Sequence, residues 1–224
     1  MHRIAAALSL AVLAACATSA GTGAGASAPA TAAAPAAQTG TFVQTRGTDT
    51  IARETFTRTA TRLDADMRMS GGRRVAYTSH LAADASVTRM ELRAYAPGAD
   101  TSAAQHVVAT LRGDSATIEV TPRGGAASTE RFGAAPGAVG YVNPSPSSLE
   151  QVVRRARAIG GDSVQVQLVG VPGRQTRPID VRFVGKDSAI VSLGSVALHL
   201  RTDGAGSLLG GTVPSQGITI TRVP

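Results

Sequence analysis

Residues 62–69 read Arg-Leu-Asp-Ala-Asp-Met-Arg-Met, so charged and apolar side chains alternate along the whole segment. Successive side chains of a β-strand point to opposite faces of its sheet. The alternation therefore predicts a strand with one buried and one solvated face. Leu63, Ala65, Met67 and Met69 share the face that we expect to be buried. A sheet with one dry and one wet face is typical of antiparallel proteins.

The same alternation recurs on both sides of this segment. Its apolar positions are Val75, Tyr77 and Leu81; Met90, Leu92 and Ala94; Val107, Ala109 and Leu111; Ala116, Ile118 and Val120; Val164, Val166 and Leu168; Ile179, Val181 and Phe183; Val196, Leu198 and Leu200; and Ile218 and Ile220. Turn sequences such as Gly113-Asp114-Ser115 separate several runs. No crossover helices separate most of them, so we expect a meander of roughly eleven or twelve antiparallel strands.

One segment, about residues 145–159, predicts a helix. Pro144 and Pro146 end the preceding chain, Ser147 is the expected N-cap, and Glu150 completes a capping box. The apolar stripe of the helix consists of Leu149, Val152, Val153, Ala156 and Ile159. Gly160 and the glycine after it end the helix. Because an apolar stripe must be covered, we expect this helix to lie against the sheet.

These patterns predict a mainly β fold for residues 42–224, a single β-rich domain of ordinary size. The expected architecture is an antiparallel meander curled into a half-barrel or open barrel, with the amphipathic helix at about 145–159 on its concave side. The alternative that the pattern leaves open is a closed, lipocalin-like barrel.

The N-terminus predicts export. Residues 1–15 combine a basic start at Arg3 with an apolar run too short to span a bilayer, as in a signal peptide. The run ends in Leu13-Ala14-Ala15-Cys16, which resembles the lipobox of bacterial lipoproteins. That resemblance implies cleavage before Cys16, lipid on its thiol and attachment to a membrane. Ala17 in place of an aspartate implies, by the same resemblance, the outer membrane, with the domain facing the periplasm.

Residues 16–41 are expected to form a lipidated tether. After Cys16, the only cysteine of the chain, the segment holds Ala, Thr, Ser, Gly and Pro with a single Gln. Such a composition offers no aliphatic or aromatic side chain larger than alanine for a core, so it predicts disorder.

The composition argues against several functions. The formal charge is +7, but the chain has no Trp, three Tyr and four Phe, so it has few side chains on which bases could stack, and nucleic-acid binding is not expected. His80, His106 and His199 have no further ligand at metal-binding spacing, so we expect no metal or cofactor. No motif for an activated nucleophile occurs either, so no catalytic residue is assigned. A hydrolase with no identifiable site is a remote alternative.

The apolar sheet face is the feature with functional potential. Small and flexible side chains on a curved sheet can leave a cavity, and methionine adapts to irregular apolar ligands. We therefore expect a non-enzymatic cell-envelope lipoprotein that binds a hydrophobic or lipid-like ligand. The expected contacts are Met67, Met69, Met90, Leu92 and Val153. The alternative is an envelope scaffold or interaction protein with a filled core.

An exported, curved antiparallel sheet with a helix on its concave side resembles the half-barrel of the LolA/LolB lipoprotein carriers. The resemblance is one of architecture and covers residues 42–224 loosely, without a matching motif. It implies a lipid-carrying cup, and it assigns no functional residue.

Overall fold

The computed structural model describes residues 36–99, 101–173 and 175–223. The expected signal peptide, Cys16 and most of the expected tether lie outside the described residues. Within them the chain forms β1 (Gln38–Arg46), β2 (Asp49–Arg58), β3 (Arg62–Met69), β4 (Arg74–Leu81), β5 (Val87–Tyr95), β6 (Gln105–Arg112), β7 (Ser115–Pro122), β8 (Ser128–Gly133), β9 (Val139–Tyr141), α1 (Pro146–Ile159), β10 (Ser163–Gly170), β11 (Gln175–Phe183), β12 (Ser188–Leu193), β13 (Val196–Thr202), β14 (Leu208–Val213), the short 3₁₀ helix η1 (Pro214–Gln216) and β15 (Ile218–Val223).

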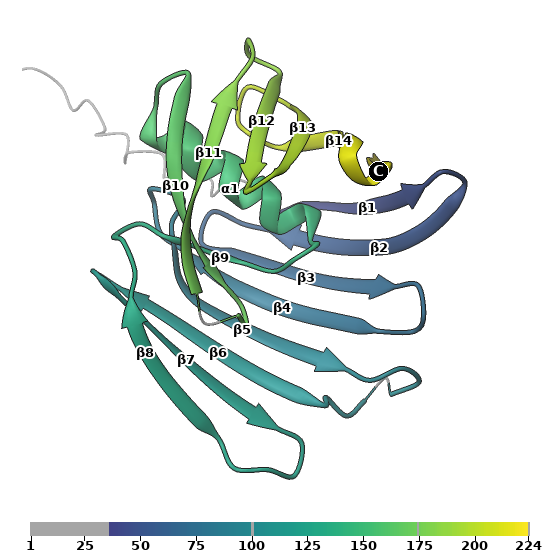
Figure 1. Ribbon diagram of the computed structural model, residues 1–224, viewed down its shortest axis with the longest axis vertical. Coiled ribbons are helices and arrows are strands. Elements are labelled where there is room, and N and C mark those ends of the chain that lie inside the picture. Colours follow the sequence, from purple (N-terminus) through teal and green to yellow (C-terminus); the bar gives the residue numbers. More distant parts are fainter. Residues whose placement is uncertain (1–35, 100, 174, 224) are drawn as a thin grey trace, which may run out of the picture. The chain divides into compact units, whose positions relative to one another are not determined.

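All of these strands belong to one curved sheet, whose strands wrap around α1 (Figure 1). The strand order is β8-β7-β6-β5-β4-β3-β2-β1-β15-β14-β13-β12-β11-β10-β9. Neighbours run antiparallel, except for the parallel pair of β9 and β10 on either side of α1. Within the described residues β8 and β9 stand at opposite ends of this order, so the sheet is open. The predicted mainly β half-barrel with one helix is confirmed, and the closed lipocalin-like alternative is wrong.

Strand β3 has the bounds and the face that its alternation predicts. Leu63, Ala65 and Met67 are buried, while the residues between them are partly exposed. Its register with β4 sets Ala65 opposite Tyr77, so that apolar side chains meet on the same face. The described chain holds more strands than the expected eleven or twelve, because short segments such as β8 and β9 join the sheet without a strong alternation of their own.

The expected tether reaches too far into the chain. Residues 38–41 belong to β1, where Gln38 pairs with Arg58 of β2 and Thr41 pairs with Val223 of β15. Backbone hydrogen bonds to two neighbouring strands can hold a segment whose side chains bury little. Gly40 fits this place because a Cβ there would lie only 3.0 Å from the ring of Phe56.

The N-cap of α1 is Ser145 rather than the expected Ser147. The Ser145 hydroxyl accepts a hydrogen bond from the Ser148 amide at 3.1 Å, and Pro146 stands at the start of the helix. The Tyr77 hydroxyl lies 2.6 Å from that of Ser145 and 2.7 Å from that of Ser147, and Glu150 reaches other partners, so no capping box forms. Because the sheet surrounds the N-terminus of the helix, Ser147 hydrogen-bonds to the Tyr77 side chain and Glu150 accepts from the Leu208 amide.

More of α1 is buried than its one apolar stripe predicts. Every residue from Pro146 to Val153 is buried, and so is Ala156, whereas Ile159 at the end of the helix is 45% exposed. The first two turns therefore lie in the centre of the curved sheet, polar residues included. In the described part of the chain, no helix combines the length and the hydropathy needed to cross a bilayer.

Candidate functional site

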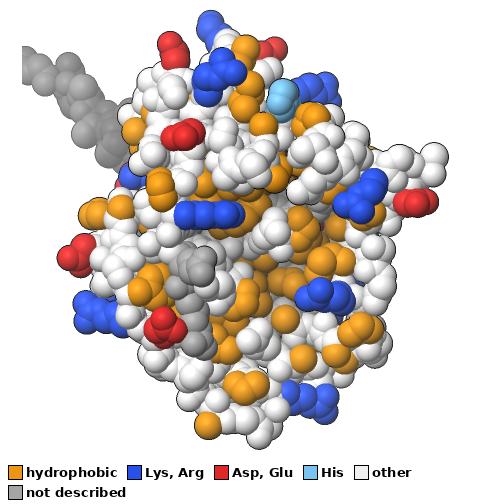
Figure 2. Space-filling model, viewed as in Figure 1, with side chains coloured by type: hydrophobic (Ala, Val, Ile, Leu, Met, Phe, Trp, Pro, Cys, Tyr) orange, Lys and Arg blue, Asp and Glu red, His pale blue; other side chains and the backbone are white. Residues whose placement is uncertain are grey.

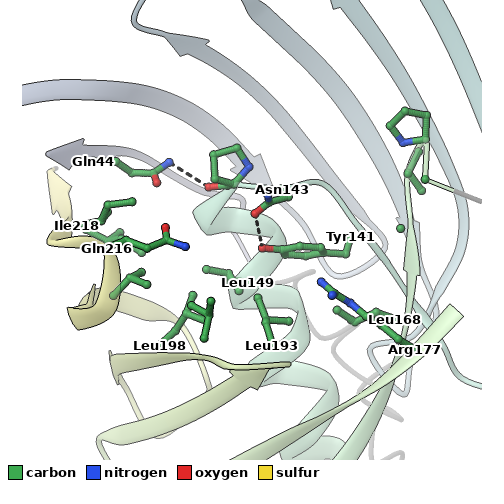
Figure 3. A pocket seen from close by; sticks show the side chains of 18 residues that line it. Gln44, Tyr141, Asn143, Leu149, Leu168, Arg177, Leu193, Leu198, Gln216 and Ile218 are labelled. Carbon is green, nitrogen blue, oxygen red and sulfur yellow. Dashed lines mark hydrogen bonds between the residues drawn. The ribbon is translucent and has the colours of Figure 1, made fainter. Parts of the chain in front are cut away.

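A cavity of about 570 Å³ lies on the concave side of the sheet, between one face of α1 and strands β10 to β15. Figure 3 shows the side chains that line it. Most of its wall is aliphatic and includes Leu149, Leu168, Leu193, Leu198, Ile218 and Ile220. In the space-filling view, hydrophobic side chains gather along a hollow across this face of the molecule, with basic side chains at its border (Figure 2).

Polar side chains form another part of the wall. Gln44 of β1 is buried and donates a hydrogen bond from Nε2 to the carbonyl of Pro144 at 3.0 Å. The hydroxyl of Tyr141 donates to Oδ1 of Asn143 at 3.3 Å (Figure 3). That bond occupies the carbonyl oxygen of Asn143 and leaves its amide NH₂ group available. Gln216 of η1 adds a second amide.

Arg177 of β11 is the one charged side chain among the described residues that line the cavity. Its backbone lies opposite Leu168 in the sheet, and its guanidinium points into the cavity (Figure 3). The side chain is exposed and forms no hydrogen bond or ion pair with another described residue. Burial raises the pKa of Tyr141 above its ordinary value, and the nearby charge of Arg177 acts in the opposite direction. Tyr141 therefore stays a neutral hydrogen-bonding group beside a cation.

A buried polar cluster, Glu54, Arg58, Glu150 and Gln151, holds α1 against the sheet. Arg58 Nε lies 2.9 Å from Glu150 Oε1, and the Arg58 guanidinium also donates to Gln151. The second oxygen of Glu150 accepts a hydrogen bond from the Leu208 amide at 2.9 Å. These contacts join α1 to both β2 and β14, which lie on either side of β1 and β15 in the sheet.

Glu54 is the least compensated member of the cluster. Its Oε1 accepts a hydrogen bond from the Ser147 amide at 3.0 Å, whereas Oε2 has no hydrogen-bond partner among the described residues. Burial raises the pKa of Glu54 to about 7, although hydrogen bonds from Ser147 and Ser145 act to lower it. The protonated carboxyl is neutral and can donate a hydrogen bond, so burial costs this form less.

None of the five residues expected to contact a ligand lines the cavity. Met67, Met90, Leu92 and Val153 are buried in the core, and Met69 is half-buried at the end of β3. For Met90 the reason is visible, because β9 covers β5 and brings Gly140 against the Met90 side chain. Contact between these five residues and a ligand stays a prediction.

The histidines lie apart, with His80 in β4, His106 in β6 and His199 in β13. Among the described residues, no group of three or more His, Cys, Asp or Glu side chains could hold a metal ion. Asp64, on the solvated face of β3, pairs with Arg62 at 2.6 Å, so the alternating charges of this strand act as surface ion pairs.

Sequence reasoning missed the residues that give the cavity its polar side. These residues come from four separate segments, which hold Gln44, Tyr141 with Asn143, Arg177, and Gln216. The segments meet only when β15 pairs with β1 and β9 pairs with β10. Arg177 carried one local signal, because it stands in phase with the apolar positions Ile179 and Val181 of its strand.

The fold and the cavity together define an open, curved antiparallel sheet that encloses a helix and leaves an apolar pocket with one cationic side chain. No protein-family model matches the chain, and no curated protein matches it significantly. A crystal structure of a DUF1089 family protein from Pseudomonas aeruginosa is similar, with a TM-score of 0.51 and 14% identity. The match covers 75% of this chain and 92% of that one, and at this identity it shows the fold alone.

Proposed function

We propose that this protein is a non-enzymatic cell-envelope lipoprotein that binds a hydrophobic or lipid-like ligand in the cavity beside α1. The observation that carries the proposal is the cavity itself, whose volume of about 570 Å³ falls within the range of small-molecule sites. Its walls of leucine, isoleucine and valine suit an alkyl or acyl chain, because each buried methylene contributes about 0.8 kcal/mol to binding.

The N-terminus supports a location beside such ligands. A lipid on Cys16 would tether the domain to a membrane, and the outer membrane is the one we propose, with the domain facing the periplasm. Between Cys16 and Gln38 lie 21 residues (38 − 16 − 1), which can span at most about 75 Å when fully extended. The formal charge of +7 favours proximity to an anionic lipid surface.

The test is binding of an uncharged fluorescent hydrophobe, N-phenyl-1-naphthylamine, to the full chain carrying Cys16→Ser. This substitution removes the protein's own lipid, so that the probe meets no competing acyl chain. We expect saturable binding with a dissociation constant on the order of micromolar, because the cost of association offsets most of the gain from apolar burial.

A filled cavity provides the matching comparison. Leu193→Trp enlarges a half-buried side chain of the wall and should weaken probe binding at least about tenfold, whereas Leu209→Trp enlarges a side chain that is 43% exposed and should leave binding unchanged. Absence of saturable binding by the Cys16→Ser chain, or equal binding by both tryptophan variants, would overturn the proposal.

A second candidate, an envelope scaffold or interaction protein, is favoured by the packing of the helix. Val152, Val153 and Ala156 are fully buried, so part of the concave side is ordinary core. A scaffold needs no ligand, and it predicts that Leu193→Trp changes stability alone and that the probe does not bind.

A further inference from the structure

Arg177 is an unusual side chain to find on the wall of an aliphatic cavity. Its neighbours on the same face of β11 are the buried Ile179 and Val181, and its cross-strand partner Leu168 is also buried. No described carboxylate lines the cavity with it, and it makes no ion pair or hydrogen bond with a described residue. The charge that the described residues contribute to the cavity wall is therefore positive.

The guanidinium of Arg177 suits an oxyanion. A guanidinium presents its N–H donors in a fork that matches the two oxygens of a carboxylate, and such charge-assisted pairs are stronger than neutral hydrogen bonds. Asn143 and Gln216 also line the cavity and carry amide NH₂ donors, although Gln216 lies on η1 at the side away from Arg177 (Figure 3). Tyr141, held neutral by burial, adds no competing negative charge.

We propose that the cavity takes a single-chain amphiphile with an anionic head, its acyl chain against the leucine and isoleucine wall and its head group at Arg177. This inference rests on the proposed function, because it names the class of ligand for the same cavity. The apolar wall and the cation line one and the same cavity, so one site can bind both the chain and the head. A small anion without a chain would leave the apolar wall uncovered.

The experiment displaces N-phenyl-1-naphthylamine from the full chain carrying Cys16→Ser with three competitors, at low salt and mildly alkaline pH. Laurate has the chain and the anion, dodecanol has the chain alone, and acetate has the anion alone. We expect laurate to displace the probe about tenfold more effectively than dodecanol, and acetate to have no effect at matched concentration.

Substitutions then assign the preference to one side chain. Arg177→Gln should reduce laurate to the level of dodecanol and leave dodecanol unchanged, and Arg177→Lys should retain part of the preference because it keeps the charge without the fork. The control is Arg182→Gln, which removes an exposed charge from the other face of the same strand and should change nothing.

The possible failures are separable. Equal displacement by laurate and dodecanol, or a laurate preference that survives Arg177→Gln, would overturn the assignment of the head group and leave the hydrophobic site standing. Displacement by acetate as strong as by laurate would show a site for small anions and would overturn the proposal that the ligand is an amphiphile. If neither the probe nor any competitor binds, the proposed function and this inference both fall.

Discussion

Arg58 Nε and Glu150 Oε1 lie 2.9 Å apart, and the two side chains are 5% and 0% exposed. The pair joins β2 to the centre of α1. Because the same carboxylate also binds the Leu208 amide, it ties the helix to both halves of the sheet. The position of α1 decides where core ends and cavity begins, since Leu149, one residue before Glu150, lines the cavity.

Glu150→Ala should therefore destabilise the fold strongly. It leaves the Arg58 charge buried and unpaired, and the removal of one partner from a buried ion pair typically costs about 3–5 kcal/mol. Urea unfolding measures the loss. Glu91→Ala is the control. The side chains of Glu91 and Arg89 are 33% and 45% exposed, so their ion pair should contribute less than about 1 kcal/mol. Similar losses for the two variants would contradict the role given to Glu150.

Glu54 should make stability depend on pH in a defined direction. Its pKa is raised from 4.5 to about 7 in the folded protein, so between these values the native state holds a proton that the unfolded state has released. Its contribution to stability is therefore present at low pH and is lost as the pH rises toward about 7. Relative to Glu54→Gln, the free energy of unfolding of the parent should fall by about 3 kcal/mol over this window.

The measurement is urea unfolding of the parent and the variant at a series of pH values, so that the other titrating groups cancel in the difference. Glu119→Gln, at an exposed position of β7, is the control and should give a flat difference. A flat difference for Glu54→Gln as well, or one that rises with pH, would contradict a Glu54 carboxyl that is buried and protonated in the folded protein.

Gly211 should tolerate no side chain. A Cβ at this position of β14 would lie 2.6 Å from the His199 carbonyl oxygen and 2.8 Å from a methyl carbon of Leu200. Gly211→Ala must push β13 and β14 apart, and we expect it to cost about 2 kcal/mol or more by thermal or urea unfolding. Gly133→Ala in β8, where a Cβ would meet nothing within 4 Å, should be neutral or slightly stabilising. A larger loss of stability for Gly133→Ala than for Gly211→Ala would contradict the close approach of β13 and β14.

Cys16 should control where the protein is found. Cys16→Ser removes the thiol that the lipobox resemblance marks for lipidation, so metabolic labelling with a radioactive fatty acid should disappear. The processed domain should then leave the membrane fraction, or the unprocessed precursor should accumulate. A variant that is processed normally and stays in the membrane fraction would rule out the lipid anchor.

The fold could be predicted where its signal is local. The alternation at Leu63, Ala65 and Met67 follows from the two-residue repeat of a strand, and it predicts both the strand and its buried face. The segment around Gln38 gave no such signal, because β2 and β15 bring it into the sheet through the backbone. The sequence does not single out Ser145 as the N-cap because three serines near Pro146 compete for that place, and in the fold Tyr77 from a distant strand contacts the hydroxyls of both Ser145 and Ser147.

The candidate site was harder to predict than the fold for a topological reason. Met67 and Met90 share the apolar face of the sheet, and the sequence cannot show which part of that face the helix and β9 will cover. The cavity remains at the other part, between α1 and strands β10 to β15. Its polar groups, such as Tyr141 and Arg177, are brought together by the pairing of β9 to β10 and of β10 to β11.

The most direct measurement is native mass spectrometry of the full chain carrying Cys16→Ser after incubation with a lipid extract of bacterial envelopes. We predict a discrete added mass of one amphiphile per chain, released on collisional activation, and present in Leu209→Trp but absent in Leu193→Trp. A bare chain under the same conditions, or an equal added mass on both tryptophan variants, would contradict the claim that the cavity beside α1 is a ligand site.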